Sequence, residues 1–326
     1  MRRRQFITLI GSAAAAWPLA AQAQSVPLVG FLSAGSLEGY ANYAVAFRQG
    51  LKETGFIRGQ NVTIEYRWAA GHYDRLPSLA SELLDHQPSL LMASGGQISV
   101  RAARLASPTI PIVFTSGADP VENGLVASLN RPEGNLTGVS FSGRTLGPKR
   151  LELMRELLPQ ATAIAVLQNP GNPLRPAELE DLRTAADRLG QQLHHYSAST
   201  VAEIDQVFAE LGQQRLEALV LNGDLFFTSQ RELIVTLAAR YRIPTIYHED
   251  AFVKIGGLIS YGADVPGAYR QAGVYAGRIL KGTKPADLPV LLPDKFDVAI
   301  NLKAAKALGL NVPESFVLFR ADEVIE

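Results

Sequence analysis

Short apolar runs alternate with longer stretches of helical periodicity along most of the chain. The apolar runs are rich in β-branched residues and end in Gly, Ser, Asn or Asp. Between residues 41 and 54, Tyr43, Phe47 and Leu51 recur at four-residue spacing, which places them on one helix face. This alternation predicts βαβ units with right-handed crossovers and parallel sheets, an α/β fold. The expected strands are 29–32, 62–66, 90–92, 110–114, 137–141, 163–167, 193–196, 218–221, 245–247, 257–261 and 296–302. The expected helices are 41–54, 76–84, 149–158, 178–189, 204–211, 231–241, 269–280 and 303–308.

Nearly a dozen strands would make an unusually wide open sheet, so we expect two sheets in two lobes. The chain is expected to cross between the lobes near Ser142, near Ala263 and again within 285–295. The first lobe then comprises 24–141 with 264–288, and the second comprises 142–263 with 289–326. Three crossover segments form a hinge around a cleft that can close. A single continuous sheet is the alternative.

The first residues depart from this pattern. Three arginines at positions 2–4 precede an apolar, alanine-rich run that ends in Ala21-Gln22-Ala23. A basic start, a short apolar segment and an A-x-A pattern predict a secretory signal peptide, residues 1–23, cleaved near Ala23. The string Arg3-Arg4-Gln5-Phe6-Ile7 resembles the twin-arginine export motif, and an ordinary signal is the alternative. No cysteine follows the cleavage site and no later run reaches about 18 apolar residues, so we expect a mature chain without a lipid anchor or membrane span.

Charge and cysteine content narrow the class of protein. The 326 residues include 31 basic and 31 acidic side chains, and 47% are apolar, as in folded globular proteins. Removal of the three N-terminal arginines leaves 28 basic and 31 acidic residues, a net charge of −3. This balance gives no electrostatic reason to expect nucleic acid or a membrane surface as a partner. The absence of cysteine excludes disulfides, thiolate catalysis, iron–sulfur clusters and cysteine-ligated zinc.

Small polar residues gather where the predicted strands end. The carboxyl ends of parallel strands face the ligand crevice of α/β sheets, so these residues are the candidates for binding. Backbone N–H groups at Ser94-Gly95-Gly96 suit a carboxylate or another anion, and acidic side chains suit an ammonium group. Aromatic rings nearby suit a flat or apolar body. The candidates are Ser33, Ser94, Gly95, Gln97, Thr115, Ser116, Asp119, Phe141, Asn169, Asn172, Asp224, Phe226, Tyr247, His248 and Glu249.

Several of these residues have a structural alternative. Gly95 and Gly96 suit a tight turn between a strand and a helix. Asp119 and Asp224 suit helix N-caps. Phe226 is adjacent to Phe227, so one ring is expected to face the cleft and the other the core.

Motifs of catalysis and metal binding are absent. Gly138-Val139-Ser140-Phe141-Ser142 lacks the last glycine of a nucleophile elbow, and His248-Glu249 is not followed by the spacing of a zinc-binding helix. No P-loop or dinucleotide fingerprint occurs. His194 and His195 are neighbours in a predicted strand, so they point to opposite faces. We therefore expect no catalytic residue, metal or cofactor, and His248 at a strand end becomes a hydrogen-bonding group of the pocket.

Several strings spread over the mature chain carry a family resemblance. They resemble ABC-transporter solute-binding proteins with the type I periplasmic-binding fold, and more narrowly the group of tryptophan- and tyrosine-type receptors. The strings are Val29-Gly30-Phe31-Leu32-Ser33, Gly59-Gln60-Asn61-Val62, Ile110-Pro111-Ile112-Val113-Phe114, Asp119-Pro120-Val121, Asn130-Arg131-Pro132, Gly134-Asn135-Leu136-Thr137-Gly138 and Ala307-Leu308-Gly309-Leu310.

The resemblance implies two Rossmann-like lobes joined by three crossover segments, with a small organic solute of the amino acid or aromatic acid type held between them. It also implies delivery to an inner-membrane ABC permease with a cytoplasmic ATPase, and a monomer in the periplasm. In receptors of this group for aromatic amino acids, hydroxyls and helix-end amides hold the carboxylate, an acid holds the ammonium and aromatics flank the ring. The positions that match the family's cleft are Ser33, Ser94, Gly95, Thr115, Asp119, Asn169, Asp224 and Tyr247.

Two other functions are compatible with the residues. A secreted α/β hydrolase would use a serine with His248 and an acid such as Glu249. A sensory module would present its liganded cleft to a membrane receptor instead of a permease.

Overall fold

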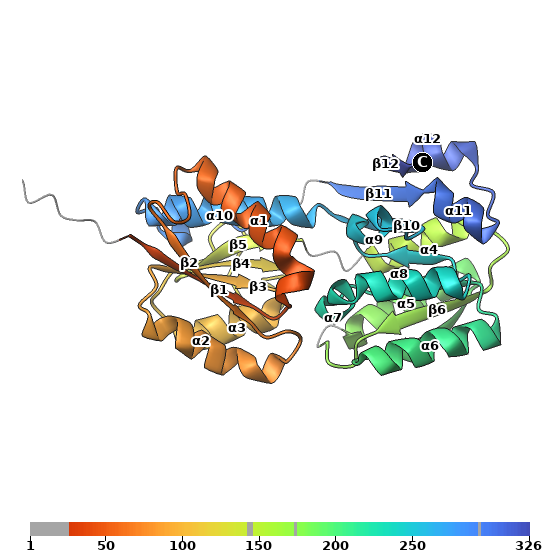
Figure 1. Ribbon diagram of the computed structural model, residues 1–326, viewed down its shortest axis with the longest axis horizontal. Coiled ribbons are helices and arrows are strands. Elements are labelled where there is room, and N and C mark those ends of the chain that lie inside the picture. Colours follow the sequence, from red (N-terminus) through yellow and green to blue (C-terminus); the bar gives the residue numbers. More distant parts are fainter. Residues whose placement is uncertain (1–25, 142–145, 173–174, 293–294) are drawn as a thin grey trace, which may run out of the picture.

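The computed structural model describes residues 26–141, 146–172, 175–292 and 295–326. Two lobes lie side by side along its long axis, and each is built on its own β-sheet (Figure 1). The prediction of two sheets is therefore confirmed, and the alternative of a single sheet is wrong. The predicted signal peptide and the crossing expected near Ser142 lie outside the described residues.

The first lobe has a five-stranded parallel sheet in the order β2-β1-β3-β4-β5. Its strands are β1 (Leu28–Ser33), β2 (Thr63–Trp68), β3 (Leu90–Ser94), β4 (Ile112–Ser116) and β5 (Leu136–Ser140). The helices packed on this sheet are α1 (Leu37–Glu53), α2 (Leu76–Asp85), α3 (Gln97–Ala106) and α10 (Val265–Leu280), with short 3-10 turns η1 (Tyr73–Arg75) and η2 (Pro285–Asp287).

Side chains alternate across this sheet and so build two cores. Phe31 of β1 packs with α1 and α10 on one face, whereas its neighbour Leu32 packs with α2 and α3 on the other. The strands are buried on both faces, which explains why they occur in the sequence as continuous apolar runs. Ser33 is paired in register with Ser94 on β3, so the carboxyl ends of neighbouring strands come out at the same edge.

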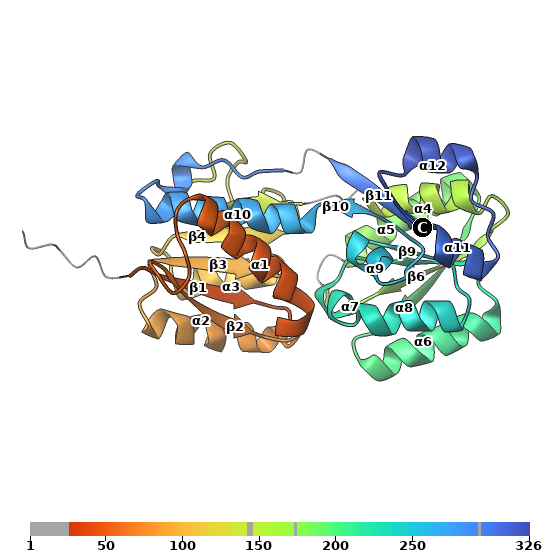
Figure 2. The same cartoon turned by 45° about the horizontal axis from the view of Figure 1, so that its top comes forward.

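Helix α10 returns from the second lobe to lie along α1, and the two views agree on this arrangement (Figures 1 and 2). Glycines permit the close approach of the two backbones. A Cβ atom at Gly50 would lie 1.8 Å from the carbonyl oxygen of Arg270, and one at Gly273 would lie 2.1 Å from that of Phe47. The crossing expected near Ala263 therefore leads into a helix that is built to pack on the first lobe.

The second lobe has a seven-stranded sheet in the order β12-β11-β10-β9-β8-β6-β7. Its strands are β6 (Ala163–Gln168), β7 (Gln192–Ser197), β8 (Ala218–Leu221), β9 (Thr245–Tyr247), β10 (Ile259–Ala263), β11 (Phe296–Asn301) and β12 (Glu323–Ile325). Helices α6 (Val201–Gln214), α8 (Arg231–Arg240) and α9 (Asp250–Lys254) pack on one face. Helices α4 (Leu146–Leu157), α5 (Arg175–Leu189), α11 (Leu302–Leu308) and α12 (Glu314–Arg320) pack on the other. The short helix α7 (Leu225–Ser229) follows β8.

The end of the chain departs from the expected parallel pattern. Strand β11 runs antiparallel to β10, and β12 is parallel to β11. The reason is that β11 follows residues 290 and 291, which are held by the first lobe, and not a helix that packs on the second sheet. Helix α3 was expected after Gly96 but without bounds. Elements α7, α9, α12 and β12 were not predicted, because segments of three to seven residues are too short to show a period.

The third crossing lies within the expected range 285–295, but after residue 291. Leu291 forms a parallel bridge with Val139, and its N–H donates to the carbonyl of Gly138 at 3.0 Å. Val290 likewise donates to the carbonyl of Leu129 at 2.7 Å. Residues 290 and 291 are therefore held by the first lobe, which corrects the second-lobe segment predicted to begin at residue 289.

Candidate ligand-binding site

A cavity of about 190 Å³ lies between the lobes, at the carboxyl ends of the parallel strands of both sheets. Its walls come from both lobes, and two direct hydrogen bonds join them across the cleft. The Tyr43 hydroxyl donates to Glu249, and Nη1 of Arg231 donates to the carbonyl of Gly39 at 3.1 Å. The predicted candidates that line the cavity are Gly95, Gln97, Phe141, Asn172, Asp224, His248 and Glu249.

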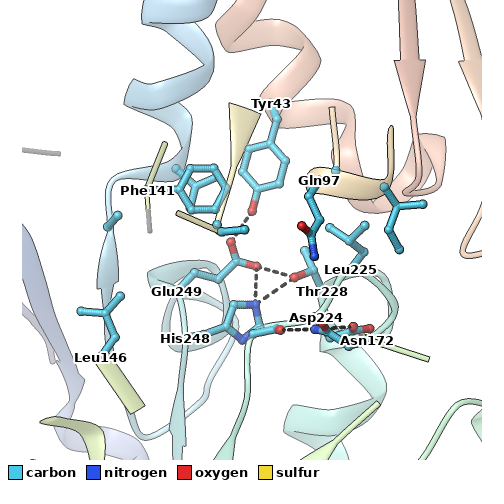
Figure 3. A pocket seen from close by; sticks show the side chains of 18 of the residues that line it. Tyr43, Gln97, Phe141, Leu146, Asn172, Asp224, Leu225, Thr228, His248 and Glu249 are labelled. Atoms are coloured by element: carbon cyan, nitrogen blue, oxygen red, sulfur yellow. Dashed lines mark hydrogen bonds and ion pairs between the residues drawn. The ribbon is translucent and has the colours of Figure 1, made fainter. Parts of the chain in front are cut away.

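Glu249 lies at the centre of the site, two residues after the end of strand β9 (Figure 3). Its side chain is only 4% exposed, and its two oxygens accept hydrogen bonds from different lobes. Oε2 accepts from Tyr43 on α1, and Oε1 accepts from the Thr228 hydroxyl on α7 at 3.0 Å. Burial raises the pKa of this carboxyl, and the hydrogen bonds from Tyr43 and Thr228 oppose the rise. An ammonium group entering the cavity would find in Glu249 a desolvated partner of opposite charge.

His248 stands beside Glu249 and is neutral. Burial lowers the pKa of the imidazole to about 3, and the charge of Arg150 adds to the effect. Nε2 lies 3.0 Å from the Thr228 hydroxyl oxygen. Because Thr228 donates its single proton to Glu249, the proton of this contact belongs to His248 Nε2. Nδ1 is then an acceptor, and it has no partner within the described part of the chain.

Asp224 lines the cavity but is also committed to local structure. As the N-cap of α7 it accepts from the Phe226 N–H at 2.9 Å through Oδ1. The same oxygen accepts from Asn169 Nδ2 at 2.8 Å, and Oδ2 accepts from Asn172 Nδ2 at 3.2 Å. Burial raises the pKa of Asp224, and these hydrogen bonds oppose the rise. Asp224 is therefore an N-cap, but of α7 and not of the helix predicted to follow Thr228, and its carboxylate still faces the cavity.

Helix α3 directs its N-terminus at the cavity. Gly95 and Gly96 adopt φ of 84° and 93°, a region in which side chains are strained, so the tight turn expected here is real. Gly95, Gly96, Gln97 and Ile98 all line the cavity, and first-turn N–H groups have no partner within their own helix. Oε1 of Gln97 is buried and has no hydrogen-bond partner in the residues described. This wall offers donors to an anion and one amide oxygen to a donor.

Most aromatic residues that line the cavity were not predicted from the sequence. Tyr40, Tyr43, Tyr73 and Tyr269 line the cavity from the first lobe, beside the predicted Phe141. Tyr43 and Tyr269 stack with ring centroids 5.0 Å apart, and Tyr40 meets Tyr43 edge-on at 5.1 Å. Burial raises the pKa of Tyr269 to about 12, so its hydroxyl stays protonated, 2.7 Å from the Ser94 hydroxyl. Three of these tyrosines lie in the first turns of α1 and α10, a position that an inspection of strand ends alone passes over.

Two charged residues of the cavity were also missed. Arg150 on α4 and Glu178 on α5 belong to helices that follow the lobe crossing and the Asn169 turn. Arg150 is 6% exposed and donates from Nε to the Tyr261 carbonyl at 2.9 Å. Glu178 accepts from Asn222 Nδ2 at 3.0 Å. Burial raises the pKa of Glu178, although the charge of Arg150 opposes the rise. In the sequence, a charged residue inside an otherwise apolar helix face was the feature that could have indicated these two residues of the cavity.

Four predicted hydroxyl residues lie outside the lining. Ser33, Ser94, Thr115 and Ser116 are fully buried at the strand ends. The Ser94 hydroxyl is hydrogen-bonded to the Tyr269 hydroxyl, and the Ser116 hydroxyl accepts from the N–H of Ala118 at 3.1 Å. Larger side chains cover these residues, so they lie behind the first-lobe residues that line the cavity and support them.

The other four predicted residues outside the lining serve local structure. Asp119 accepts from the N–H groups of Val121 and Glu122, but it caps a turn and not the helix that its capping alternative predicted. Asn169 donates a hydrogen bond to Asp224. Phe226 packs on the second-lobe core. Tyr247 is fully buried and stacks on Phe252 at 4.7 Å, because its strand face is the one covered by helices. The aromatic contacts expected from the second lobe are thus supplied by the first.

The site has the composition of a binding cleft between two closing lobes, and the chain belongs to a known family of such proteins. A family model for ABC transporter substrate-binding proteins matches residues 29–325. The chain is a member of this family, which is one of solute-binding proteins and not a class of enzymes. The hydrolase alternative required a serine against His248, whose ring instead contacts Thr228 and Glu249.

Relatives and solved structures agree with this assignment. The tyrosine-binding protein of Clostridioides difficile is 30% identical over 264 residues, which are 81% of this chain and 75% of that protein. A conserved domain protein from Vibrio cholerae superposes with a TM-score of 0.82 at 27% identity, over 92% of this chain and 99% of that one. An ABC domain from Streptococcus pneumoniae in complex with L-Trp gives 0.81 at 24% identity, over 92% of this chain and all of that one. The predicted fold and the predicted Trp/Tyr-type receptor group are confirmed.

The lobes of this structure are closed on one another. The ligand-free, open form of a substrate-binding protein with adhesive properties from Clostridium difficile gives a TM-score of only 0.65 at 26% identity. It covers 92% of this chain and 99% of its own, so the lower score is not a matter of coverage. In this structure Tyr43 and Glu249 meet directly across the cleft.

Proposed function

We propose that this substrate-binding protein captures an aromatic α-amino acid in the interlobe cleft. One observation carries the proposal: the buried carboxylate of Glu249 faces a wall of four tyrosines across the cavity. A carboxylate removed from water favours an ammonium group, and stacked tyrosine rings favour a flat apolar body. The amides at the start of α3 and the guanidinium of Arg150 are the groups available to a carboxylate.

The relatives support this class of solute. A protein named for binding tyrosine is 30% identical to this chain over 264 residues. The cavity is mostly apolar apart from a few convergent polar groups, which is typical of small-molecule sites.

A thermal-shift screen tests the proposal. The panel contains L-tyrosine, L-tryptophan, L-phenylalanine, benzoate and a set of monosaccharides. A bound solute at a hundredfold excess over Kd stabilises the folded chain by about 2.7 kcal/mol. We expect the aromatic amino acids to raise the melting temperature and the monosaccharides to leave it unchanged. A shift with benzoate alone would assign the cleft to aromatic acids, and a shift with sugars alone would contradict the proposal.

We also propose that residues 1–23 direct export and that the mature monomer works in the periplasm with an inner-membrane ABC permease. No helix in the described ranges is long and apolar enough to cross a membrane. Replacement of Arg3 and Arg4 by lysine should block export if the twin-arginine route is used, and it should leave export intact on the general route. Loss of uptake of the identified solute in a deletion strain would separate transport from the sensory alternative.

A further inference from the structure

Arg150 is the single cation among the described residues that line the cavity. It lies on α4, near the start of the second lobe, and its side chain is almost completely removed from solvent. Its Nε donates a hydrogen bond to the carbonyl of Tyr261 on β10, which fixes the orientation of the planar guanidinium. The terminal amino groups are not used by this bond and remain available to the cavity.

The charge of Arg150 is only partly offset by the described acidic side chains. No ion pair joins it to a carboxylate within the described residues, and the acid that influences it most, Glu178, is hydrogen-bonded to Asn222. Burial lowers the pKa of Arg150 to about 10, and Glu178 opposes the fall, so the guanidinium is still charged at neutral pH. The same charge contributes to keeping His248 neutral.

A buried cation without an anion is costly, and this cost disappears when a ligand supplies the anion. A guanidinium offers a planar fork of N–H donors that matches a carboxylate in bidentate geometry. Glu249, on the same lobe, offers the opposite charge. The second lobe therefore presents a fixed cation and a fixed anion in one cavity, as an amino acid zwitterion requires.

We propose that Arg150 is the anchor for the carboxylate of the bound solute, so that the cleft selects carboxylates over the corresponding amines. This inference rests on the proposed function and adds to it the group that recognises the acid end. It differs from the expectation that hydroxyls and the amides of α3 hold the carboxylate, since it places that group on the opposite lobe.

Three compounds that share the same aromatic ring but differ in their charged groups test whether Arg150 anchors the carboxylate. Titration calorimetry compares L-tyrosine, tyramine, which lacks the carboxylate, and 3-(4-hydroxyphenyl)propanoate, which lacks the ammonium group. The wild-type protein should bind L-tyrosine about 100-fold more tightly than tyramine. In the Arg150→Gln variant this ratio should fall to about threefold or less, because tyramine never used the guanidinium.

Arg155→Gln is the matched control, because Arg155 lies on the same helix and donates to the carbonyl of Ala161 outside the cavity. Its ratio should equal that of the wild type. If Arg150→Gln does not fold, Arg150→Lys keeps the charge but loses the fork, and the ratio should fall about tenfold. An unchanged ratio in the folded Arg150 variant would overturn the inference and place the carboxylate at the start of α3.

The outcomes separate the inference from the proposed function. Equal binding of L-tyrosine and tyramine by the wild type would overturn the anchor but leave the aromatic receptor standing. Binding of none of the three compounds would contradict the proposed function, and the anchor with it.

Discussion

The two walls of the cleft differ in chemistry. The first lobe supplies every phenylalanine and tyrosine ring of the cavity lining, and the second lobe supplies every charged side chain. The charged side chains are Arg150, Glu178, Asp224 and Glu249. A solute with two charged ends and a flat body would be held electrostatically by one lobe and covered by the other. Closure of the aromatic wall removes water from the charged wall, and ionic contacts strengthen as the local dielectric falls.

Glu249→Gln tests the charged wall most directly. The substitution keeps the shape but removes the charge that an ammonium group would meet, so affinity for an ammonium-bearing solute should fall by about 2–3 kcal/mol. Isothermal titration calorimetry measures the change, with 3-(4-hydroxyphenyl)propanoate as a ligand that lacks the ammonium group. An equal loss for both ligands would mean that Glu249 acts only by holding the lobes together.

Asp224→Ala separates capping from binding on the same wall. Loss of the N-cap and of the bonds from Asn169 and Asn172 should lower the free energy of unfolding by about 1–2 kcal/mol. Chemical denaturation of the ligand-free protein measures this loss. Binding should weaken less than in Glu249→Gln, because the oxygens of Asp224 are already committed to three donors. Affinity that falls further than in Glu249→Gln would make Asp224 the main ammonium partner.

Tyr43→Phe removes the bond that joins the two walls. The aromatic ring stays, but the hydroxyl that donates to Glu249 is lost, so affinity should fall by about 1 kcal/mol. Tyr40→Phe is the matched control, since Tyr40 lies one turn earlier on α1 and its hydroxyl makes no hydrogen bond to the residues described. Calorimetry with L-tyrosine compares the two variants. Equal losses would show that the hydroxyl of Tyr43 has no role in closure.

Changes of stability and affinity with pH should be the smallest of the expected effects. Glu249 has a raised pKa in the folded chain, so above its ordinary value of 4.5 the folded state keeps a proton that the unfolded state has lost. Its contribution to stability is therefore present at low pH and is lost as pH rises through the raised pKa. A bound ammonium favours the ionised form, so affinity should rise over the same window, by less than about tenfold per pH unit. Melting and binding curves from pH 4.5 to 7.5 should show both trends in the wild type and weaker ones in Glu249→Gln.

His248 lies on the charged wall of the second lobe but contributes no charge to it. With its pKa lowered to about 3, it stays neutral throughout this range, so no step near pH 6.5 is expected in the binding curve. A step that disappears in His248→Gln would show that the imidazole is protonated in the cleft.

Repeating apolar runs and strand-end residues predicted the two sheets and most elements to within a few residues, and seven of the fifteen candidate residues line the cavity. Residues that leave a strand directly into the cleft, such as Gly95, Asp224 and Glu249, were found because parallel strands share one edge. Tyr43 and Tyr269 were missed because their helices approach the cleft from the side. Tyr247 was misplaced because its orientation depends on which face of β9 the helices cover.

The sequence by itself determined the fold class, the family and the edge of each sheet at which a ligand would bind. These properties follow from local periodicity and from strings of neighbouring residues. Only the tertiary structure decided which side chains meet in the cavity, because the tyrosine wall, the Tyr43–Glu249 contact and the isolated charge of Arg150 join segments far apart in the chain. Their geometry depends on the packing of α10 on α1 and on lobe closure, which no local pattern encodes.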